Sequence, residues 1–112
     1  AGKTVVIAKH TPGFIVNYLL VPQLFNAVRT YEKGIASKED IDNAMKLGLN
    51  HPLGPFALID LMGVDVVCFI ARAIYEETKD PQFVIPTTVQ KMFTAGWFGR
   101  KTGRGFYEYQ KT

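Results

Sequence analysis

The fold is decided by the stretch from Thr11 to Gly34, which reads TPGFIVNYLLVPQLFNAVRTYEKG. Thr11 can cap a helix whose first position is Pro12, because proline loses no hydrogen bond there. The first half is apolar nearly all round, which is typical of a central helix buried on most faces. We expect Pro22 to kink the helix and Gly34 to end it, with Ile35 forming an apolar contact at its C-terminal end.

Four shorter helices are predicted after this one, over residues 38–49, 55–62, 64–79 and 86–95. Ser37 resembles the first residue of a capping box, Pro55 can open the next helix, and Gly63 separates that helix from the following one. Helical spacing predicts inward-facing residues on three of them: Ile41, Ala44, Met45 and Gly48; Val67, Ile70, Ala71 and Ile74; and Val89, Met92 and Phe93. The sequence therefore predicts an all-α fold, a compact bundle of about five helices with short extended segments at both ends.

The two ends of the chain differ from this helical pattern. Residues 1–10 are rich in β-branched side chains and read as a short strand, which has no partner in a helical chain. We therefore expect residues 1–10 to be the last strand or linker of an upstream domain that is missing, and residues 11–112 to form a separate helical domain.

The segment from Trp97 to Tyr109 combines glycines, basic residues and aromatic residues. Its glycines follow a helix at the wrong spacing for a dinucleotide-binding fingerprint, and Arg100 stands where a Walker A loop needs glycine before Lys101. We expect a surface turn followed by an extended tail. The alternative is that its positive charge assists the binding of a phosphate-bearing ligand.

Composition sets limits on function. The chain has 112 residues, a net charge of +3 and one cysteine. It is long enough for one domain with a real core, and its mild charge does not by itself indicate a nucleic-acid partner. No apolar run reaches the ~18 residues of a membrane span. Cys68 lies in an apolar stretch, which favours a buried thiol in a reducing compartment.

Asn17 is the most informative polar residue, because it interrupts the apolar run from Phe14 to Val21. A buried amide needs hydrogen-bond partners. Asn17 can therefore bind a substrate oxygen, or it can tie its helix to a neighbouring loop. Gly13 lies one turn earlier on the same face and would allow a ligand or another backbone to approach closely.

Other groups that could carry chemistry are sparse. His10 and His51 have no carboxylate at a spacing that would orient them as general bases, and His51 can instead cap the helix that ends near Leu49. Asp60 and Asp65 are not a convincing acid–base pair. Two distant histidines and one cysteine do not make a metal site, so we expect none.

Four segments in series resemble the 3-hydroxyacyl-CoA dehydrogenase family. They are Thr11-Pro12-Gly13-Phe14-Ile15-Val16-Asn17; Ala36-Ser37-Lys38-Glu39-Asp40-Ile41-Asp42 with Ala44-Met45-Lys46-Leu47-Gly48; Pro52-Leu53-Gly54-Pro55-Phe56 with Leu58-Ile59-Asp60; and Lys101-Thr102-Gly103-Arg104-Gly105-Phe106-Tyr107. The resemblance spans almost the whole chain. It implies a helical fold similar to the C-terminal domain of 6-phosphogluconate dehydrogenase.

The resemblance also implies a function and a site. The family interconverts 3-hydroxyacyl-CoA and 3-oxoacyl-CoA with NAD in fatty-acid β-oxidation or butanoate metabolism, and the upstream domain binds NAD and carries a catalytic His–Glu pair. The helical domain would form one wall of the acyl-CoA cleft and a homodimer interface. Asn17 would orient the substrate, and the other residues implied at the substrate are Gly13, Pro52, Gly54 and Pro55. Tyr18 departs from many members, which have Arg. We expect this chain alone to bind no cofactor and to have no turnover.

Three alternatives remain at this point. One is another β-hydroxyacid-type dehydrogenase, and a second is a helical dimerisation module without a catalytic role. A nucleic-acid-binding module is third, because the positive residues gather in one tail only. We expect no nucleic-acid or membrane partner, and a location in the bacterial cytoplasm, with the mitochondrial matrix as the alternative.

Overall fold

The computed structural model of the chain describes residues 12–109, and the expected strand over residues 1–10 and the cap at Thr11 lie outside them. Its elements are α1 (Pro12–Glu32), α2 (Lys38–Leu49), α3 (Pro55–Met62), α4 (Val64–Thr78), the 3-10 turn η1 (Pro81–Phe83), α5 (Thr87–Ala95) and the 3-10 turn η2 (Arg100–Thr102). The described residues contain two isolated β-bridges and no longer strand. The all-α prediction of about five helices is confirmed.

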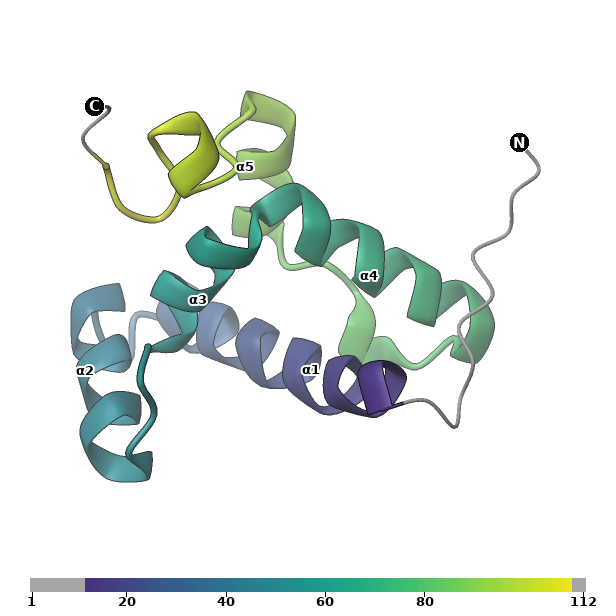
Figure 1. Ribbon diagram of the computed structural model, residues 1–112, viewed down its shortest axis with the longest axis horizontal. Coiled ribbons are helices and arrows are strands. Elements are labelled where there is room, and N and C mark those ends of the chain that lie inside the picture. The colour runs from purple at the N-terminus through teal and green to yellow at the C-terminus, as the bar shows by residue number, and fades with distance from the viewer. Residues whose placement is uncertain (1–11, 110–112) are drawn as a thin grey trace.

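The helices pack around α1 and α4, which run side by side along the molecule (Figure 1). The short helix α3 packs against α1, α2 and α4, and α5 packs against α4. In Figure 1, α2 lies at the edge of the molecule and the C-terminal segment lies beside α5. This arrangement leaves one end of α1 and one end of α2 outside the packed centre.

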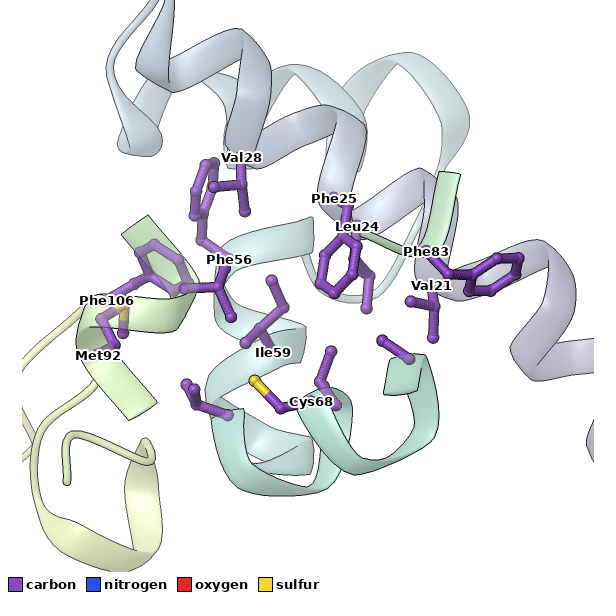
Figure 2. Packing of buried hydrophobic residues seen from close by; sticks show 14 of the residues in the cluster. Val21, Leu24, Phe25, Val28, Phe56, Ile59, Cys68, Phe83, Met92 and Phe106 are labelled. Atoms are coloured by element: carbon purple, nitrogen blue, oxygen red, sulfur yellow. The ribbon is translucent and has the colours of Figure 1, made fainter. Parts of the chain in front are cut away.

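The core joins the second half of α1 to α3 and α4. Figure 2 shows Leu24 and Phe25 of α1 near Ile59 of α3 and Cys68 of α4, with Phe56 and Phe106 meeting edge to face. Large apolar side chains of this kind each contribute roughly 1.5–3 kcal/mol when fully buried. The buried apolar residues are Val21, Leu24, Phe25, Val28, Ile41, Phe56, Ile59, Val64, Val67, Cys68, Ala71, Ile74, Phe83, Val89, Met92 and Phe106.

The first half of α1 is not buried, and the prediction of a helix covered on most faces is wrong there. Ile15 is 50% exposed and Leu19 is 68% exposed, whereas full burial begins at Val21. Phe14 and Tyr18 are only partly buried against the core. The physical reason is that, among the described residues, the other helices reach only one side of these first turns.

The helix α2 is capped as predicted but is less buried than predicted. The Ser37 hydroxyl accepts a hydrogen bond from the Asp40 backbone N–H at 3.0 Å. Ile41 is buried and Met45 is half-buried, but the expected inward residues Ala44 and Gly48 are exposed. Only the start of α2 packs on the rest of the molecule, so its later turns project into solvent.

The turn after α1 forms through its backbone alone. Gly34 has a φ of +75°, and the Ile35 N–H donates to the Thr30 carbonyl oxygen at 3.3 Å. The expected apolar contact of Ile35 is wrong, because its side chain is 70% exposed. Backbone hydrogen bonds and a left-handed glycine are sufficient to end the helix here.

The C-terminal segment forms the predicted surface turn, in which Arg100, Lys101 and Arg104 are exposed, but it does not continue as an extended tail. Gly99, Gly105 and Phe106 are buried, and the chain bends through bridges between Gly99 and Arg104 and between Arg104 and Glu108. The tail is not extended because Asp60 of α3 accepts hydrogen bonds from its backbone.

Candidate functional site

The candidate site is one face of α1, and it begins with the residues singled out from the sequence. Gly13, Asn17, Leu20 and Leu24 are four, three and four residues apart, so they form one continuous stripe along the helix. A Cβ on Gly13 would meet no other atom within 4 Å, so the stripe is open at that end. At Leu24 the same stripe enters the core.

Asn17 lies in the middle of this stripe and is half-buried. Its side chain forms no hydrogen bond with any residue between 12 and 109, so the described structure gives no contact that ties it to a neighbouring loop. The amide carries two N–H donors and a carbonyl acceptor, and these remain available to a ligand. Asn17 therefore has the exposure and the free donors that a substrate-orienting residue needs.

An open apolar cavity of about 490 Å³ continues the stripe toward the turn between α2 and α3. Pro52 and Pro55, both predicted site residues, line it together with Leu20 and Leu24. Its full lining is Leu20, Gln23, Leu24, His51, Pro52, Leu53, Pro55, Leu58 and Leu61. Such a cavity suits an apolar group with few polar atoms of its own.

Gly54 has a different role from its two proline neighbours. It is buried, and a Cβ at this position would overlap the Asp42 backbone. Asp42 in turn accepts hydrogen bonds from the Phe56 N–H at 2.7 Å and the Ala57 N–H at 3.1 Å, which satisfies the first turn of α3. Gly54 therefore allows the turn to pack against α2, and it shapes the cavity wall from behind.

Tyr18 anchors the first half of α1 on its other side. Its hydroxyl donates to the Asp80 carboxylate (Oδ2) at 3.1 Å, and its ring packs between Phe14 and Phe83 at centroid distances of 5.6 and 5.2 Å. The hydrogen bond to Asp80 raises the pKa of the Tyr18 hydroxyl. The Gln82 backbone N–H, which donates to Asp80, lowers the pKa of that carboxylate.

The histidines do not form a general base within the described residues. His10 lies outside them, and His51 lines the apolar cavity without a hydrogen bond to any residue between 12 and 109. The prediction that His51 caps α2 is wrong, because Asn50 does so in a left-handed conformation with φ +56°. Asparagine tolerates this conformation better than most residues.

The described residues also contain no group of three or more potential metal ligands. Cys68 is free and buried, as predicted, and burial raises the pKa of its thiol. A buried thiol with a raised pKa is a poor nucleophile. No helix in the part of the chain between residues 12 and 109 combines the length and apolar character that crossing a membrane requires.

Sequence reasoning missed the two buried carboxylates that hold the loops. Asp60 accepts hydrogen bonds from the Phe106 N–H at 2.9 Å, the Tyr107 N–H at 3.0 Å and the Tyr109 hydroxyl at 2.7 Å. Asp42 accepts one from the Tyr107 hydroxyl at 2.7 Å. The signal for Asp60 was available, since it is the only charged residue in the apolar helix α3.

Asp60 and Asp65 bind different groups of the C-terminal segment and share no partner among the described residues. Asp60 accepts the Phe106 N–H at 2.9 Å, whereas the Asp65 carboxylate pairs with the Lys101 ammonium at 2.7 Å. Burial pushes the pKa of Asp65 upward, but the hydrogen bond from Lys101 and the adjacent backbone outweigh it and lower that pKa. Among the described residues, both carboxylates hold the C-terminal segment in place.

Comparisons with known proteins agree on one family. Residues 13–109 match the model of the 3-hydroxyacyl-CoA dehydrogenase C-terminal domain. The mitochondrial hydroxyacyl-coenzyme A dehydrogenase of Sus scrofa is 52% identical over 97% of this chain, and the 3-hydroxybutyryl-CoA dehydrogenase of Clostridioides difficile is 49% identical over 97%. The chain spans 35% and 39% of the lengths of these two relatives.

A solved structure shows the same relationship in three dimensions. The crystal structure of (S)-3-hydroxybutyryl-CoA dehydrogenase from Ralstonia eutropha superposes with a TM-score of 0.84 at 44% identity. The superposition covers 90% of this chain and 36% of that one. The helical arrangement around the Asn17 stripe is therefore shared with longer proteins.

Proposed function

Because the chain belongs to the 3-hydroxyacyl-CoA dehydrogenase family and matches its C-terminal domain, we propose that it forms the substrate-side wall of such an enzyme. The reaction interconverts a 3-hydroxyacyl-CoA and a 3-oxoacyl-CoA with NAD. The observation that carries the proposal is Asn17, whose amide is half-exposed on an open helix face and free of hydrogen bonds within residues 12–109.

The role of Asn17 is to orient the substrate. An amide N–H that donates to the C3 oxygen would hold this atom in one position while the bond order to carbon changes. A fixed donor at an oxygen that gains negative charge stabilises the transition state more than the ground state. Asn17 has no titrating proton near neutral pH, so the proton itself must be moved by another group.

The glycine-rich C-terminal segment does not fit the pyrophosphate of NAD. The glycines of the C-terminal segment follow helix α5, and Gly99 and Gly105 pack against Asp60, so they cannot cradle a pyrophosphate. We therefore place NAD and the His–Glu pair in an upstream domain, as the family resemblance implies. On this proposal, the chain alone binds no cofactor and catalyses no turnover.

The apolar cavity supplies the second part of the substrate site. Pro52 and Pro55 line it next to Leu20 and Leu24, and an apolar portion of the acyl-CoA would displace water from these surfaces. Gly13 would leave room for the substrate at the open end of the stripe. Gly54 would contribute indirectly, by holding the turn against Asp42.

The proposed partners come from the family resemblance, and the exposed surfaces support them. The proposed occupants of the exposed first half of α1 are the acyl-CoA and the protein's own N-terminal NAD-binding domain, and a homodimer would cover further apolar surface. We assign no nucleic-acid or membrane partner. Relatives include mitochondrial and bacterial enzymes, and the bacterial cytoplasm is our proposed location.

The test is NADH oxidation with acetoacetyl-CoA, measured on the parent protein that joins this chain to its NAD-binding domain. Asn17→Ala should lower kcat by about a hundredfold, the usual loss for one donor to a developing oxyanion, with the unfolding midpoint unchanged. Asn43→Ala, at an exposed position of α2, is the matched control and should retain activity.

Two results would overturn the proposal. One is a parent protein that is inert on short and long 3-oxoacyl-CoA substrates. The other is an Asn17→Ala variant with normal turnover and reduced stability, which would favour the alternative of a non-catalytic helical dimerisation module.

A further inference from the structure

We propose that Tyr18 is a positioning residue for Asn17, acting through the hydrogen bond of its hydroxyl to Asp80. This inference rests on the proposed function of Asn17. Tyr18 itself faces the α4–η1 side of α1 and packs against Phe14 and Phe83, so it acts through the helix and not on the substrate.

The anchor at Asp80 is well fixed. Asp80 lies between α4 and η1, where its Oδ1 accepts the Gln82 N–H at 3.0 Å and its own N–H donates to the Thr78 hydroxyl at 3.2 Å. Its second oxygen, Oδ2, receives the Tyr18 hydroxyl. Phe83, which follows in η1, is fully buried and packs on the Tyr18 ring. A hydrogen bond to this carboxylate therefore ties α1 to a rigid corner of the core.

Between residues 12 and 109, the first half of α1 is held by the packing of Phe14 and Tyr18 and by the Tyr18 hydrogen bond. Ile15, Val16 and Leu19 are exposed, and full burial begins only at Val21. Within residues 12–109, no other side chain of α1 before Asn26 hydrogen-bonds to another helix. Among the described residues, the Tyr18 hydroxyl therefore makes the one side-chain hydrogen bond from these turns to a neighbouring element, whereas ring packing alone would allow the helix to rotate or slide.

Asn17 precedes Tyr18 directly, so any rotation of the helix end moves its amide. Neighbouring residues lie about 100° apart around a helix, which places Asn17 on the open stripe when Tyr18 points at Asp80. A displacement of about 1 Å at a group that orients the reacting atoms can lower the rate by about a hundredfold. The hydrogen bond of Tyr18 therefore fixes the position and direction of the Asn17 amide N–H.

The test is Tyr18→Phe in the parent enzyme, which removes the hydroxyl and keeps the ring. We expect kcat to fall by about fivefold, the factor that one ordinary hydrogen bond supplies, with KM changed by less than about twofold. Tyr31→Phe is the matched control, because the Tyr31 hydroxyl forms no hydrogen bond with residues 12–109 and should be dispensable. Asp80→Asn keeps a cap for η1 but accepts a weaker bond, and should show a smaller loss in the same direction.

A double-mutant cycle separates positioning from general stability. If Tyr18 acts through Asn17, Tyr18→Phe should cause no further loss of kcat in an Asn17→Ala background. A Tyr18→Phe enzyme with normal kcat, or an equal fivefold loss in both backgrounds, would overturn the inference while leaving the role of Asn17 intact. An inert parent, or a fully active Asn17→Ala enzyme, would instead overturn the proposed function.

Discussion

Asp42 and Asp60 connect segments of this domain that lie far apart in the sequence. Asp42 of α2 holds the start of α3 and the Tyr107 hydroxyl, and Asp60 of α3 holds the backbone of Phe106 and the Tyr109 hydroxyl. A buried carboxylate is unfavourable unless its oxygens are hydrogen-bonded, and bonds to a charged acceptor are stronger than neutral ones. Each aspartate therefore holds a loop in place through specific hydrogen bonds.

Replacement of Asp60 by asparagine tests how much its hydrogen bonds to the C-terminal segment contribute to the free energy of unfolding. Asp60→Asn places an N–H₂ group opposite backbone N–H donors, so we expect the free energy of unfolding to fall by about 2–4 kcal/mol in urea denaturation. Asp40→Asn, at an exposed position in the first turn of α2, removes only a favourable charge at the helix N-terminus and should lower it by about 1 kcal/mol at most. Equal losses in the two variants would contradict the role of Asp60 in holding the C-terminal segment.

The raised pKa values of Tyr107 and Tyr109 lead us to expect a loss of stability at high pH. Burial, followed by hydrogen bonds to Asp42 and Asp60, raises the pKa of the Tyr107 and Tyr109 hydroxyls. In the unfolded chain these hydroxyls ionise near their ordinary pKa of about 10, so above that pH the unfolded state binds fewer protons. Their contribution is therefore complete below about pH 10 and decreases as the pH rises further.

Thermal unfolding between pH 8 and 12 tests this prediction. The unfolding midpoint should decrease above about pH 10, and Tyr109→Phe should make that decrease shallower. Tyr31→Phe, which removes a hydroxyl that hydrogen-bonds to neither aspartate, is the matched control for the loss of one tyrosine hydroxyl. A slope that Tyr109→Phe does not alter would rule out this explanation.

At the residue scale, the sequence pointed to the half-exposed Asn17 more clearly than to the buried Asp42 and Asp60. Asn17 stood out because it interrupts an apolar helix, and the structure leaves its amide without a hydrogen bond among residues 12–109. The resemblance to a family, more than helical periodicity, then gave it a role. Asp42 and Asp60 were not assigned, because their partners are 14 and 46 residues away in the chain and become neighbours only through folding.

At the element scale, the junction between α2 and α3 depends on a close approach at Gly54. A Cβ there would overlap the Asp42 backbone, which cannot move without disturbing the start of α3. Gly54→Ala should therefore lower the free energy of unfolding by about 2–3 kcal/mol. It should also deform the cavity wall at Pro52 and Pro55, and so raise KM for the acyl-CoA in the parent enzyme.

Gly48→Ala provides the matched control on the preceding helix. Gly48 lies inside α2 with no atom within 4 Å of the added Cβ, so the change should stabilise the protein by about 0.5–1 kcal/mol. Urea denaturation of both variants gives the comparison. If Gly54→Ala were as stable as Gly48→Ala, the close approach at Asp42 would contribute nothing to the free energy of unfolding.

Helix ends were predictable because their signals are local. Ser37, Pro55, Gly63 and Gly96 mark boundaries that the structure confirms, since caps and left-handed turns depend on a few neighbouring residues. The covered face of each helix was less predictable. The apolar side chains of α1 and α2 indicated burial, but the described residues cover only one side of the first half of α1 and leave the last turn of α2 exposed.

At the scale of the whole molecule, apolar side chains gather on surfaces that the described residues leave open. Leu19 lies on the first half of α1, and Val66 and Phe69 lie three residues apart on α4, with Phe69 56% exposed. Clustered apolar groups on a protein surface are typical of sites covered by another molecule. The proposed upstream domain and a second copy of the protein would cover such surfaces, and the two helices are our proposed contributors to a dimer.

Sedimentation of the parent protein at micromolar concentration tests this assembly. We expect a dimer, and we expect Phe69→Glu to shift it to monomer, because a charge buried without a partner in an apolar interface is strongly unfavourable. Leu47→Glu is the matched control, since Leu47 is 86% exposed on the projecting part of α2, away from both helices of the proposed interface. A parent protein that is already a monomer would contradict the dimer, and equal dissociation by both variants would show that the interface does not depend on α4 specifically.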